Sequence, residues 1–337
     1  MLKNTLFDKF CMFQRWAGIA LMPRHIIWEP TFRCCYRCTF CGFYGPGGAT
    51  PNISKEMSLE EIKTMWKKIQ KEYPFVSYYV SITGGEPLAR PDFIDIIKVL
   101  RECQFNYGIT TNGYLLTDAI VDEIRDCVKV NVSLHGLKDV HDKTVNVPGA
   151  FDKVTENIKM LRRKKIEVMI NCVITNENID QLVDMTKLAD ELQVNLRFQH
   201  LEFLSPETAA AHCKFMTDKL GEAYPVKYGT TTLTKENVEK LKKFMADHPD
   251  EFFEPDEVDI DKYYNNPNWS RRPHCLFPWG VARIDPYGNV YPCVDYFYGN
   301  LKEQTLRQIW KGDKAKKFRS LLKQCKLFPG CKRCCKL

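Results

Sequence analysis

The sequence has no long uninterrupted apolar run, no internal repeat and no low-complexity tract. Without an apolar run of about 18 residues, there is no candidate for a membrane-spanning helix. The N-terminal residues also lack the apolar core of a secretory signal peptide, so we expect a cytoplasmic protein. Excess charge of one sign is small too. The net charge is only +7 over 337 residues, which argues against a dedicated nucleic-acid binder.

Cysteine, by contrast, is plentiful, with 15 in the chain. A disulfide framework is typical of small secreted domains and does not suit a chain of this length. Nine cysteines fall in two clusters, three near residue 38 and six between residues 275 and 335. Clustered cysteines in a cytoplasmic protein indicate metal ligands. Five single cysteines are interpreted as small buried hydrophobic residues: Cys11, Cys103, Cys127, Cys172 and Cys213.

The first cluster lies in the stretch from residue 31 to residue 45, TFRCCYRCTFCGFYG. Cys34, Cys38 and Cys41 form the spacing C-x3-C-x2-C, which Cys35 does not fit. Three thiolates can anchor an iron–sulfur cluster and leave one iron open, whereas a structural site prefers four ligands. A zinc loop with a distant fourth ligand is the alternative, and the spacing alone leaves both open.

Between residues 24 and 203, strand and helix patterns alternate. Six short segments rich in β-branched and aromatic residues are the expected strands: residues 25–30, 76–83, 106–111, 128–134, 167–175 and 195–203. Helical patterns fill the gaps, and one of them starts with a capping box formed by Ser58 and Glu61. The pattern predicts an α/β fold with a parallel sheet, either an open barrel or doubly wound. The cysteine loop follows the first strand, so we expect it at the carboxyl ends of the strands, where such folds place their sites.

Four regions are predicted along the chain. Residues 1–23 form an amphipathic N-terminal segment, residues 24–203 the barrel, residues 204–274 a linker or lid with a polar helix, and residues 275–337 a compact cysteine-rich domain. The N-terminal segment combines apolar residues at helical spacing with basic ones. We favour a helix docked on the main domain. The alternative is a peripheral contact of residues 1–23 with a membrane or a lipid-like substrate.

The second expected strand ends in Thr83-Gly84-Gly85-Glu86-Pro87. Two glycines let the backbone turn tightly and approach a ligand, and Pro87 can open a helix. In isolation this is an ordinary strand-to-helix turn. Here the turn lies on the face expected for the cysteine loop.

The cysteine motif, with Phe40 before its last cysteine, and the later Gly-Gly-Glu-Pro resemble the radical SAM superfamily over about residues 24–203. The resemblance implies a partial (β/α)6 barrel in which Cys34, Cys38 and Cys41 hold a [4Fe–4S] cluster whose open iron is chelated by S-adenosylmethionine. It also implies a set of cofactor-binding residues: Gly84, Gly85 and Glu86 around the methionine amino group, Ser133 near the ribose, and Asn112. Two features depart from the family pattern. His135 replaces an aspartate, and an arginine is missing after His141-Asp142.

The C-terminal end resembles the SPASM/twitch extensions of radical SAM enzymes. Cys275 and Cys293 flank a hairpin-like turn at Gly288, and four more cysteines follow. The resemblance implies one auxiliary [4Fe–4S] cluster, because six cysteines are too few for two. Its expected ligands are Cys275, Cys293, Cys331 and Cys334, with Cys325 or Cys335 as substitutes for one of them. A zinc site with four cysteine ligands is the alternative.

Three polar residues are the candidates for direct work on the substrate. Asp295, two residues after Cys293, is the expected proton acceptor, although an aspartate in a hairpin is usually a turn residue. His200 and Glu202 alternate with apolar neighbours at the end of the sixth strand, so we expect both at the barrel mouth as substrate contacts. His212 lies farther along, on an uncertain loop.

These patterns predict a radical SAM enzyme that reductively cleaves S-adenosylmethionine to a 5′-deoxyadenosyl radical, which abstracts hydrogen from an unactivated C–H of the substrate. The auxiliary cluster serves electron transfer or substrate binding. We expect a small-molecule, peptide or lipid substrate and an electron donor such as flavodoxin or ferredoxin. The lack of room before Arg24 for a leader-peptide domain disfavours a self-sufficient peptide maturase. The competing hypothesis is a non-enzymatic protein with two zinc sites.

Overall fold

The computed structural model describes residues 6–42, 52–74, 76, 78–222, 232–256, 258–266, 268–293 and 296–334. Within these residues, one curved sheet has the strand order β10-β9-β8-β1-β2-β3-β4-β5-β6-β7. The strands are β1 (His25–Trp28), β2 (Tyr79–Ile82), β3 (Asn106–Thr111), β4 (Val130–Ser133), β5 (Val168–Val173), β6 (Asn195–Gln199), β7 (Phe252–Glu254), β8 (Val281–Ile284), β9 (Asn289–Tyr291) and β10 (Gly299–Asn300).

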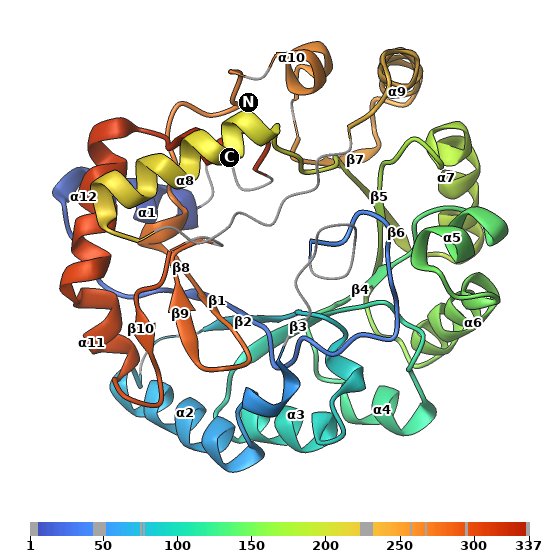
Figure 1. Cartoon of the computed structure of the whole chain (residues 1–337). Coiled ribbons are helices and arrows are strands. Elements are labelled where there is room, and N and C mark those ends of the chain that lie inside the picture. Colours follow the sequence, from blue (N-terminus) through green and yellow to red (C-terminus); the bar gives the residue numbers. More distant parts are fainter. Residues whose placement is uncertain are drawn as a thin grey trace.

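Helices accompany this sheet, and those between residues 59 and 191 lie on its outer face (Figure 1). They are α1 (Leu6–Ala17), α2 (Leu59–Glu72), α3 (Phe93–Glu102), α4 (Asp118–Glu123), α5 (Lys138–Val145), α6 (Ala150–Arg163), α7 (Leu182–Glu191), α8 (Pro206–Leu220), α9 (Lys235–Asp247), α10 (Ile260–Asn265), α11 (Leu306–Lys311) and α12 (Asp313–Cys325). Short 3-10 turns are η1 (Ile53–Lys55), η2 (Pro87–Ala89), η3 (Ile179–Gln181), η4 (Phe277–Trp279) and η5 (Pro329–Cys331).

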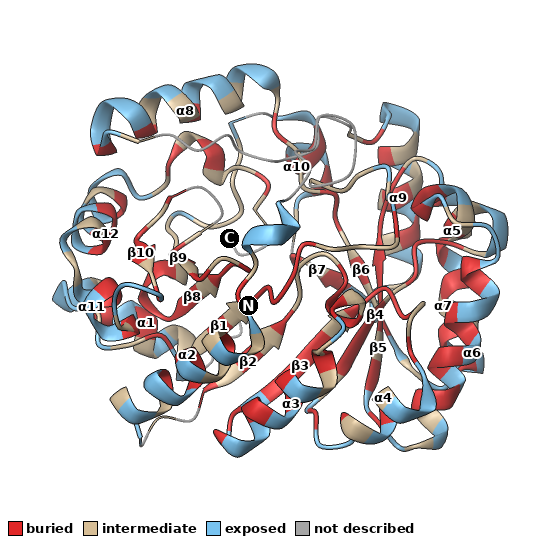
Figure 2. Ribbon diagram, turned by 60° about the horizontal axis from the view of Figure 1, so that its bottom comes forward, coloured by how far each residue is buried: buried red, intermediate tan, exposed pale blue. Residues whose placement is uncertain are grey.

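All six strands predicted between residues 24 and 203 are present, and each pairs with its sequence neighbour in parallel. Their apolar side chains form the core with the inner faces of the helices, which Figure 2 colours as buried. The predicted capping box is confirmed, because the Ser58 side chain accepts from the Glu61 N–H and the Glu61 side chain accepts from the Ser58 N–H. The α/β fold with a parallel sheet is therefore confirmed.

The sheet extends beyond the six predicted strands at both edges. β7, from the region expected to be a linker, pairs in parallel with β6. β8, from the cysteine-rich end, pairs in parallel with β1, with His25 opposite Val281. The expected hairpin at Gly288 is present: β8 and β9 are antiparallel, and Gly288 has φ +85°. The C-terminal hairpin is thus joined to the barrel sheet through β8, and the predicted boundaries at residues 203 and 275 stay predictions.

The N-terminal helix α1 is docked on the main body, as the favoured interpretation expected. Cys11 and Gln14 are buried, and the Gln14 amide donates to the Trp279 carbonyl at 2.9 Å. Among the described residues, no helix combines the length and apolar character needed to cross a bilayer.

Candidate active site

The cysteine loop follows β1 and is described as far as Gly42. It is fixed to the end of α5 by two backbone hydrogen bonds, from Arg37 N to Val145 O at 3.0 Å and from Thr39 N to Thr144 O at 3.1 Å. Tyr36, a residue of the loop, is buried and forms a small apolar cluster with Val145 and Ala150. The side chains of Cys34, Cys35 and Cys38 pack against this cluster. The loop therefore lies at the carboxyl end of β1, as predicted.

The glycine pair after β2 runs directly against this loop. Gly85 N donates to Thr31 O at 3.0 Å, and Glu86 N donates to Arg33 O at 2.6 Å. A Cβ atom at Gly84 would lie 2.5 Å from Thr31 O, and one at Gly85 would lie 2.6 Å from Phe32 O. Gly84 also has φ +123°, a conformation that favours glycine. Only glycine lets the two chain segments approach this closely, so the pair packs directly against the residues that lead into the cysteines.

Glu86 directly follows the glycine pair and is fully buried. Its carboxylate accepts from Leu88 N at 3.0 Å, from the Thr111 hydroxyl at 2.7 Å and from Asn112 N at 2.6 Å. Burial raises the pKa of Glu86 to about 7, against the opposing effect of these donors. A carboxylate has about four acceptor positions, so three donors leave one for a further partner.

The thiols of the loop lie close enough to one another to interact electrostatically. Burial raises the pKa of Cys34 and of Cys38 to about 12, and neighbouring thiols, with Glu86 beside Cys34, add to the effect. Buried thiols of this kind become thiolates only when a cation compensates the charge, which is what a bound metal supplies. The three cysteines of the loop supply the kind of donor that an iron–sulfur cluster takes.

Asn112 connects the third strand to the same loop. Its backbone N–H donates to Glu86, and its side-chain amide donates to the Cys35 sulfur at 3.3 Å. Cys35, which does not fit the ligand spacing, thus has a partner of its own. Ser133 is the last residue of β4 and lies opposite Asn171 on β5. The predicted cofactor contacts of Asn112 and Ser133 stay predictions.

His135, where the family pattern has an aspartate, is a buried structural residue. Its Nδ1 accepts from Val173 N at 3.2 Å, and the Phe40 ring of the cysteine loop packs edge-on against it at 4.9 Å. Burial lowers the pKa of His135 to about 3, so the imidazole is neutral. The sequence pattern did not predict this contact between the substituted position and the loop.

His200 does not lie at an open barrel mouth, so its expected position is wrong. The ring is fully buried against Phe253 and Tyr263, and its Nδ1 is 3.2 Å from the Tyr264 hydroxyl. The cause is β7 and α10, which cover the end of β6 and were not predicted there. Glu202 is partly exposed. Asp295 lies outside the described residues.

The C-terminal cysteines lie in or next to four elements, η4, β9, α12 and η5. Cys275 precedes η4, Cys293 follows β9, and Cys331 and Cys334 lie in and after η5, all partly exposed. Cys325 ends α12 and is exposed, while Cys335 lies outside the described residues. Among the described residues, which include Cys34, Cys38 and Cys41, no three or more histidines, cysteines or carboxylates are grouped so that they could hold a metal ion.

Two buried residues hold the segment around Cys331. Arg333 is 5% exposed and donates to the Trp269 carbonyl at 2.9 Å and to the Asn266 carbonyl. His212 is in α8, not in a loop, and its Nδ1 accepts from Gly330 N at 3.1 Å. His212 is thus placed by the structure as a support for the cysteine segment. Lone polar residues in a sequence give no local signal for such long-range contacts.

The C-terminal hairpin also contacts the cysteine loop. Arg283 of β8 forms a two-pronged ion pair with Glu29, which is 3% exposed and lies just after β1; the Nε–Oε2 distance is 2.9 Å. At the hairpin tip, Tyr287 packs edge-on against Phe32 with ring centroids 5.8 Å apart. Sequence reasoning missed both residues of the ion pair. A glutamate directly after the apolar residues of a strand, in His25-Ile26-Ile27-Trp28-Glu29, was the available signal.

Comparison with protein families agrees with this geometry. Residues 28–189 match the model of the radical SAM superfamily. Residues 275–335 match the model of an iron–sulfur cluster-binding domain, SPASM. The chain belongs to the radical SAM superfamily. As a radical SAM enzyme with a SPASM domain, it uses S-adenosylmethionine and more than one [4Fe–4S] cluster. The hypothesis of a non-enzymatic zinc protein is therefore set aside.

Individual relatives differ in activity. The AdoMet-dependent heme synthase of Methanosarcina barkeri is 27% identical over 316 residues, which cover 89% of this chain and 84% of the relative. The GTP 3′,8-cyclase of Clostridium perfringens is 31% identical over 222 residues, 64% of this chain and 62% of the cyclase. Among solved structures, Streptococcus suis SuiB bound to S-adenosylmethionine has a TM-score of 0.66 at 15% identity, covering 97% of this chain and 75% of SuiB. The enzyme anSMEcpe with bound AdoMet has a TM-score of 0.65 at 20% identity, covering 92% of this chain and 85% of the other. These structures support the radical SAM fold.

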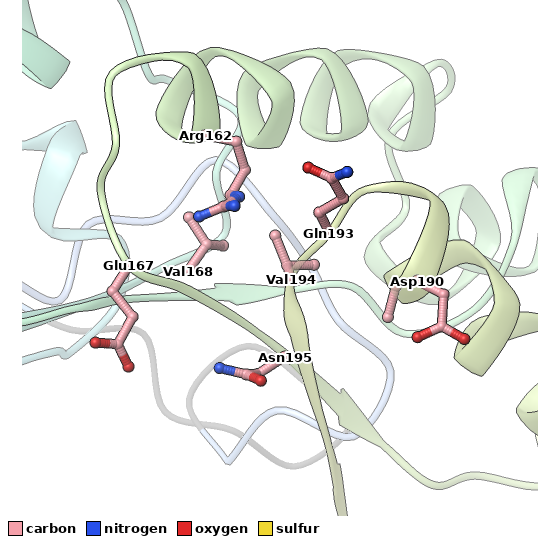
Figure 3. A pocket seen from close by; sticks show the side chains of 8 residues that line it. Arg162, Glu167, Val168, Asp190, Gln193, Val194 and Asn195 are labelled. Atoms are coloured by element: carbon pink, nitrogen blue, oxygen red, sulfur yellow. The ribbon is translucent and has the colours of Figure 1, made fainter.

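A pocket of about 270 Å³ lies away from this site (Figure 3). It is lined by Val168, Val194 and Asn195 at the amino ends of β5 and β6, together with Arg162 and Asp190. Parallel α/β folds place their sites at the carboxyl ends of the strands. The pocket therefore lies at the amino ends of the strands, and the cysteine loop of this radical SAM enzyme lies at the carboxyl end of β1.

Proposed function

We propose that Cys34, Cys38 and Cys41 hold the cluster that cleaves S-adenosylmethionine, and that Gly84 and Gly85 bind the cofactor beside it. The observation that carries the proposal is the close passage of the glycine pair against the cysteine loop. Bound together, cluster and cofactor supply one-electron reductive cleavage to methionine and a 5′-deoxyadenosyl radical, which takes hydrogen from an unactivated C–H of the substrate. An electron donor such as flavodoxin or ferredoxin supplies the electron.

The protein contributes binding, orientation and exclusion of water. Three thiolates leave one iron open for the cofactor. The backbone carbonyls of the glycine pair and the remaining acceptor position of Glu86 suit the ammonium group of the methionine moiety. Ser133 and Asn112, on the ends of neighbouring strands, are the proposed contacts near the ribose. Burial around the loop protects reactive species from water.

We assign the auxiliary [4Fe–4S] cluster to Cys275, Cys293, Cys331 and Cys334, for electron transfer or substrate binding. The contacts that hold the Cys331 segment through Arg333 and His212 support this assignment. Asp295 is the proposed proton acceptor. Glu202 is retained as a proposed substrate contact, whereas His200 is not, because it is fully buried. The substrate is a small molecule, a peptide or a lipid.

The test is anaerobic reconstitution followed by reduction with dithionite in the presence of S-adenosylmethionine. Wild-type protein should bind roughly eight irons per chain and form 5′-deoxyadenosine, detected by mass spectrometry. Cys38→Ala should lose 5′-deoxyadenosine formation and keep roughly four irons. Cys35→Ala is the matched control, since it removes a neighbouring thiol outside the proposed ligand set. Equal iron loss in both variants would overturn the assignment. Transfer of deuterium from labelled candidate substrates into 5′-deoxyadenosine tests hydrogen abstraction.

A second candidate activity is AdoMet-dependent heme synthesis. The observation that favours it is the extent of the match to the Methanosarcina barkeri enzyme, which covers 89% of this chain and 84% of the relative. The reconstituted enzyme would then form heme from a tetrapyrrole precursor, visible as the heme absorption spectrum. Formation of 5′-deoxyadenosine without heme in the presence of the precursor would exclude this candidate and leave the first one standing.

A further inference from the structure

The outer face of α1 is apolar and uncovered. Leu6 is 87% exposed, Phe13 54% and Trp16 76%, and Met12 is exposed beside them. With Lys9, these residues follow the three- and four-residue steps of one helix face. Large exposed apolar side chains grouped on one face indicate an interaction surface. Ile19 and Leu21, just after the helix, are each 40% exposed and extend the surface.

This face is fixed outward by the way α1 is attached. The opposite face is closed against η4, where Gly280 leaves room for Cys11: a Cβ atom at Gly280 would clash with the Cys11 sulfur. Gln14 donates to the Trp279 carbonyl and accepts from Leu21 N at 2.6 Å. The α1 helix therefore cannot turn its apolar stripe toward the core without losing these contacts.

A basic surface adjoins the apolar stripe. The segment of residues 306–326, which contains α11 and α12, has eight lysines and arginines and a single acidic residue. The two surfaces meet where the Lys323 ammonium donates to the Trp16 carbonyl at 3.0 Å, and Figure 1 shows α1 beside α12. A cavity of about 700 Å³ lies at this junction, lined by residues 18–21 and by Lys311, Lys316 and Arg319. The Arg319 guanidinium is 6% exposed, and its Nη2 has no hydrogen-bond partner.

We propose that α1 and the α11–α12 face together dock the enzyme on an anionic phospholipid membrane. The apolar stripe enters the interface, with Trp16 and Phe13 at headgroup level, where aromatic rings are favoured. The lysines face the lipid phosphates, and the cavity receives a headgroup. Charge complementarity and the aromatic stripe act together, because neither alone gives stable interfacial binding. The proposal does not depend on the reaction catalysed.

Co-sedimentation with vesicles tests the proposal on the reconstituted enzyme. Vesicles of phosphatidylcholine and phosphatidylglycerol in equal parts should bind the protein, and vesicles of phosphatidylcholine alone should bind it at least tenfold more weakly. The double variants Phe13→Ser/Trp16→Ser and Lys311→Glu/Lys316→Glu should each lose at least tenfold in binding to the anionic vesicles. The matched controls are Phe252→Ser, at an aromatic residue that is 46% exposed on β7, and Lys153→Glu on α6.

Tryptophan fluorescence gives a second readout. Of the six tryptophans, Trp28, Trp66, Trp279 and Trp310 are buried and Trp269 is half-buried, so a blue shift on adding anionic vesicles is assigned to Trp16 only if it disappears in Trp16→Phe. Trp16→Phe should keep binding and lose the shift. The proposal is overturned if the wild-type protein does not bind anionic vesicles, or if the aromatic and lysine variants bind them as the controls do. It is also overturned if only the lysine variant loses binding and an oligonucleotide competes for the same surface. That last outcome would indicate nucleic acid. Unchanged iron content in the variants confirms that they are folded.

Discussion

Replacing Gly85 by alanine tests whether the close passage of two chain segments builds the cofactor site. The added Cβ would lie 2.6 Å from Phe32 O and closer still to Arg33 O, and both are backbone atoms that cannot rotate away. The segments must separate, which weakens the hydrogen bonds from Gly85 N to Thr31 O and from Glu86 N to Arg33 O. Two hydrogen bonds at about 1 kcal/mol each, with about 1–3 kcal/mol for overpacking, give a loss of about 3–5 kcal/mol.

The assay combines urea denaturation, iron analysis and 5′-deoxyadenosine formation. Gly85→Ala should bind roughly four irons in place of roughly eight and form no 5′-deoxyadenosine. Gly221→Ala is the matched control. Gly221 has φ +82°, but an added Cβ meets nothing within 4 Å, so the cost is about 1–2 kcal/mol of backbone strain with full iron content. A Gly85→Ala protein with unchanged iron and activity would refute the reasoning.

Three further changes give distinct results. Arg283→Met leaves the buried Glu29 carboxylate unpaired and should lower the free energy of unfolding, measured with urea, by about 3–5 kcal/mol. Arg125→Met breaks an exposed pair and should lower it by less than about 1 kcal/mol. Similar losses in the two variants would contradict this. Burial lowers the pKa of His200 to about 3, so between about pH 6.5 and pH 3 the unfolded chain binds a proton that the folded chain does not. The free energy of unfolding therefore falls as pH falls. Between pH 6 and pH 5 this fall should be about 1 kcal/mol smaller in His200→Phe than in the wild type. Equal falls in the two proteins would be evidence against it. Arg333→Met removes two hydrogen bonds to the loop after α10 and should lower iron to roughly four per chain while 5′-deoxyadenosine still forms; full iron content would show that Arg333 does not hold the cysteine segment.

The parallel sheet could be predicted because its strands have a strong local signal. Residues 106–111 are predicted as a strand and form β3 with the same bounds, since aromatic and β-branched residues such as Tyr107 and Ile109 favour strands. β7 was missed because Phe252–Glu254 is only three residues long and follows a polar stretch. The position of β7 is determined by its pairing with β6, and no local sequence pattern predicts that pairing.

The direction of polar side chains could not be predicted in the same way. Alternation at the end of β6 predicts that His200 points away from its apolar neighbour Leu201, but both are buried, because the pattern does not say what covers that strand. Three aromatic rings from β7 and α10 surround the histidine and exclude solvent. The cysteine and glycine motifs were easier, because each is defined by spacing within one short segment whose position at the strand ends follows from the fold.

The pairing of β8 with β1 changes how iron loss should be interpreted. The hairpin that leads to Cys293 also holds the first cysteine loop, through Arg283 and Glu29 and through the contact of Tyr287 with Phe32. A variant that unfolds the hairpin would therefore lose iron from both sites, even if the two clusters share no ligand. Cys38→Ala removes a thiol and leaves these contacts in place. Ligand variants in the first loop can therefore separate the two clusters, whereas changes that unfold the hairpin cannot.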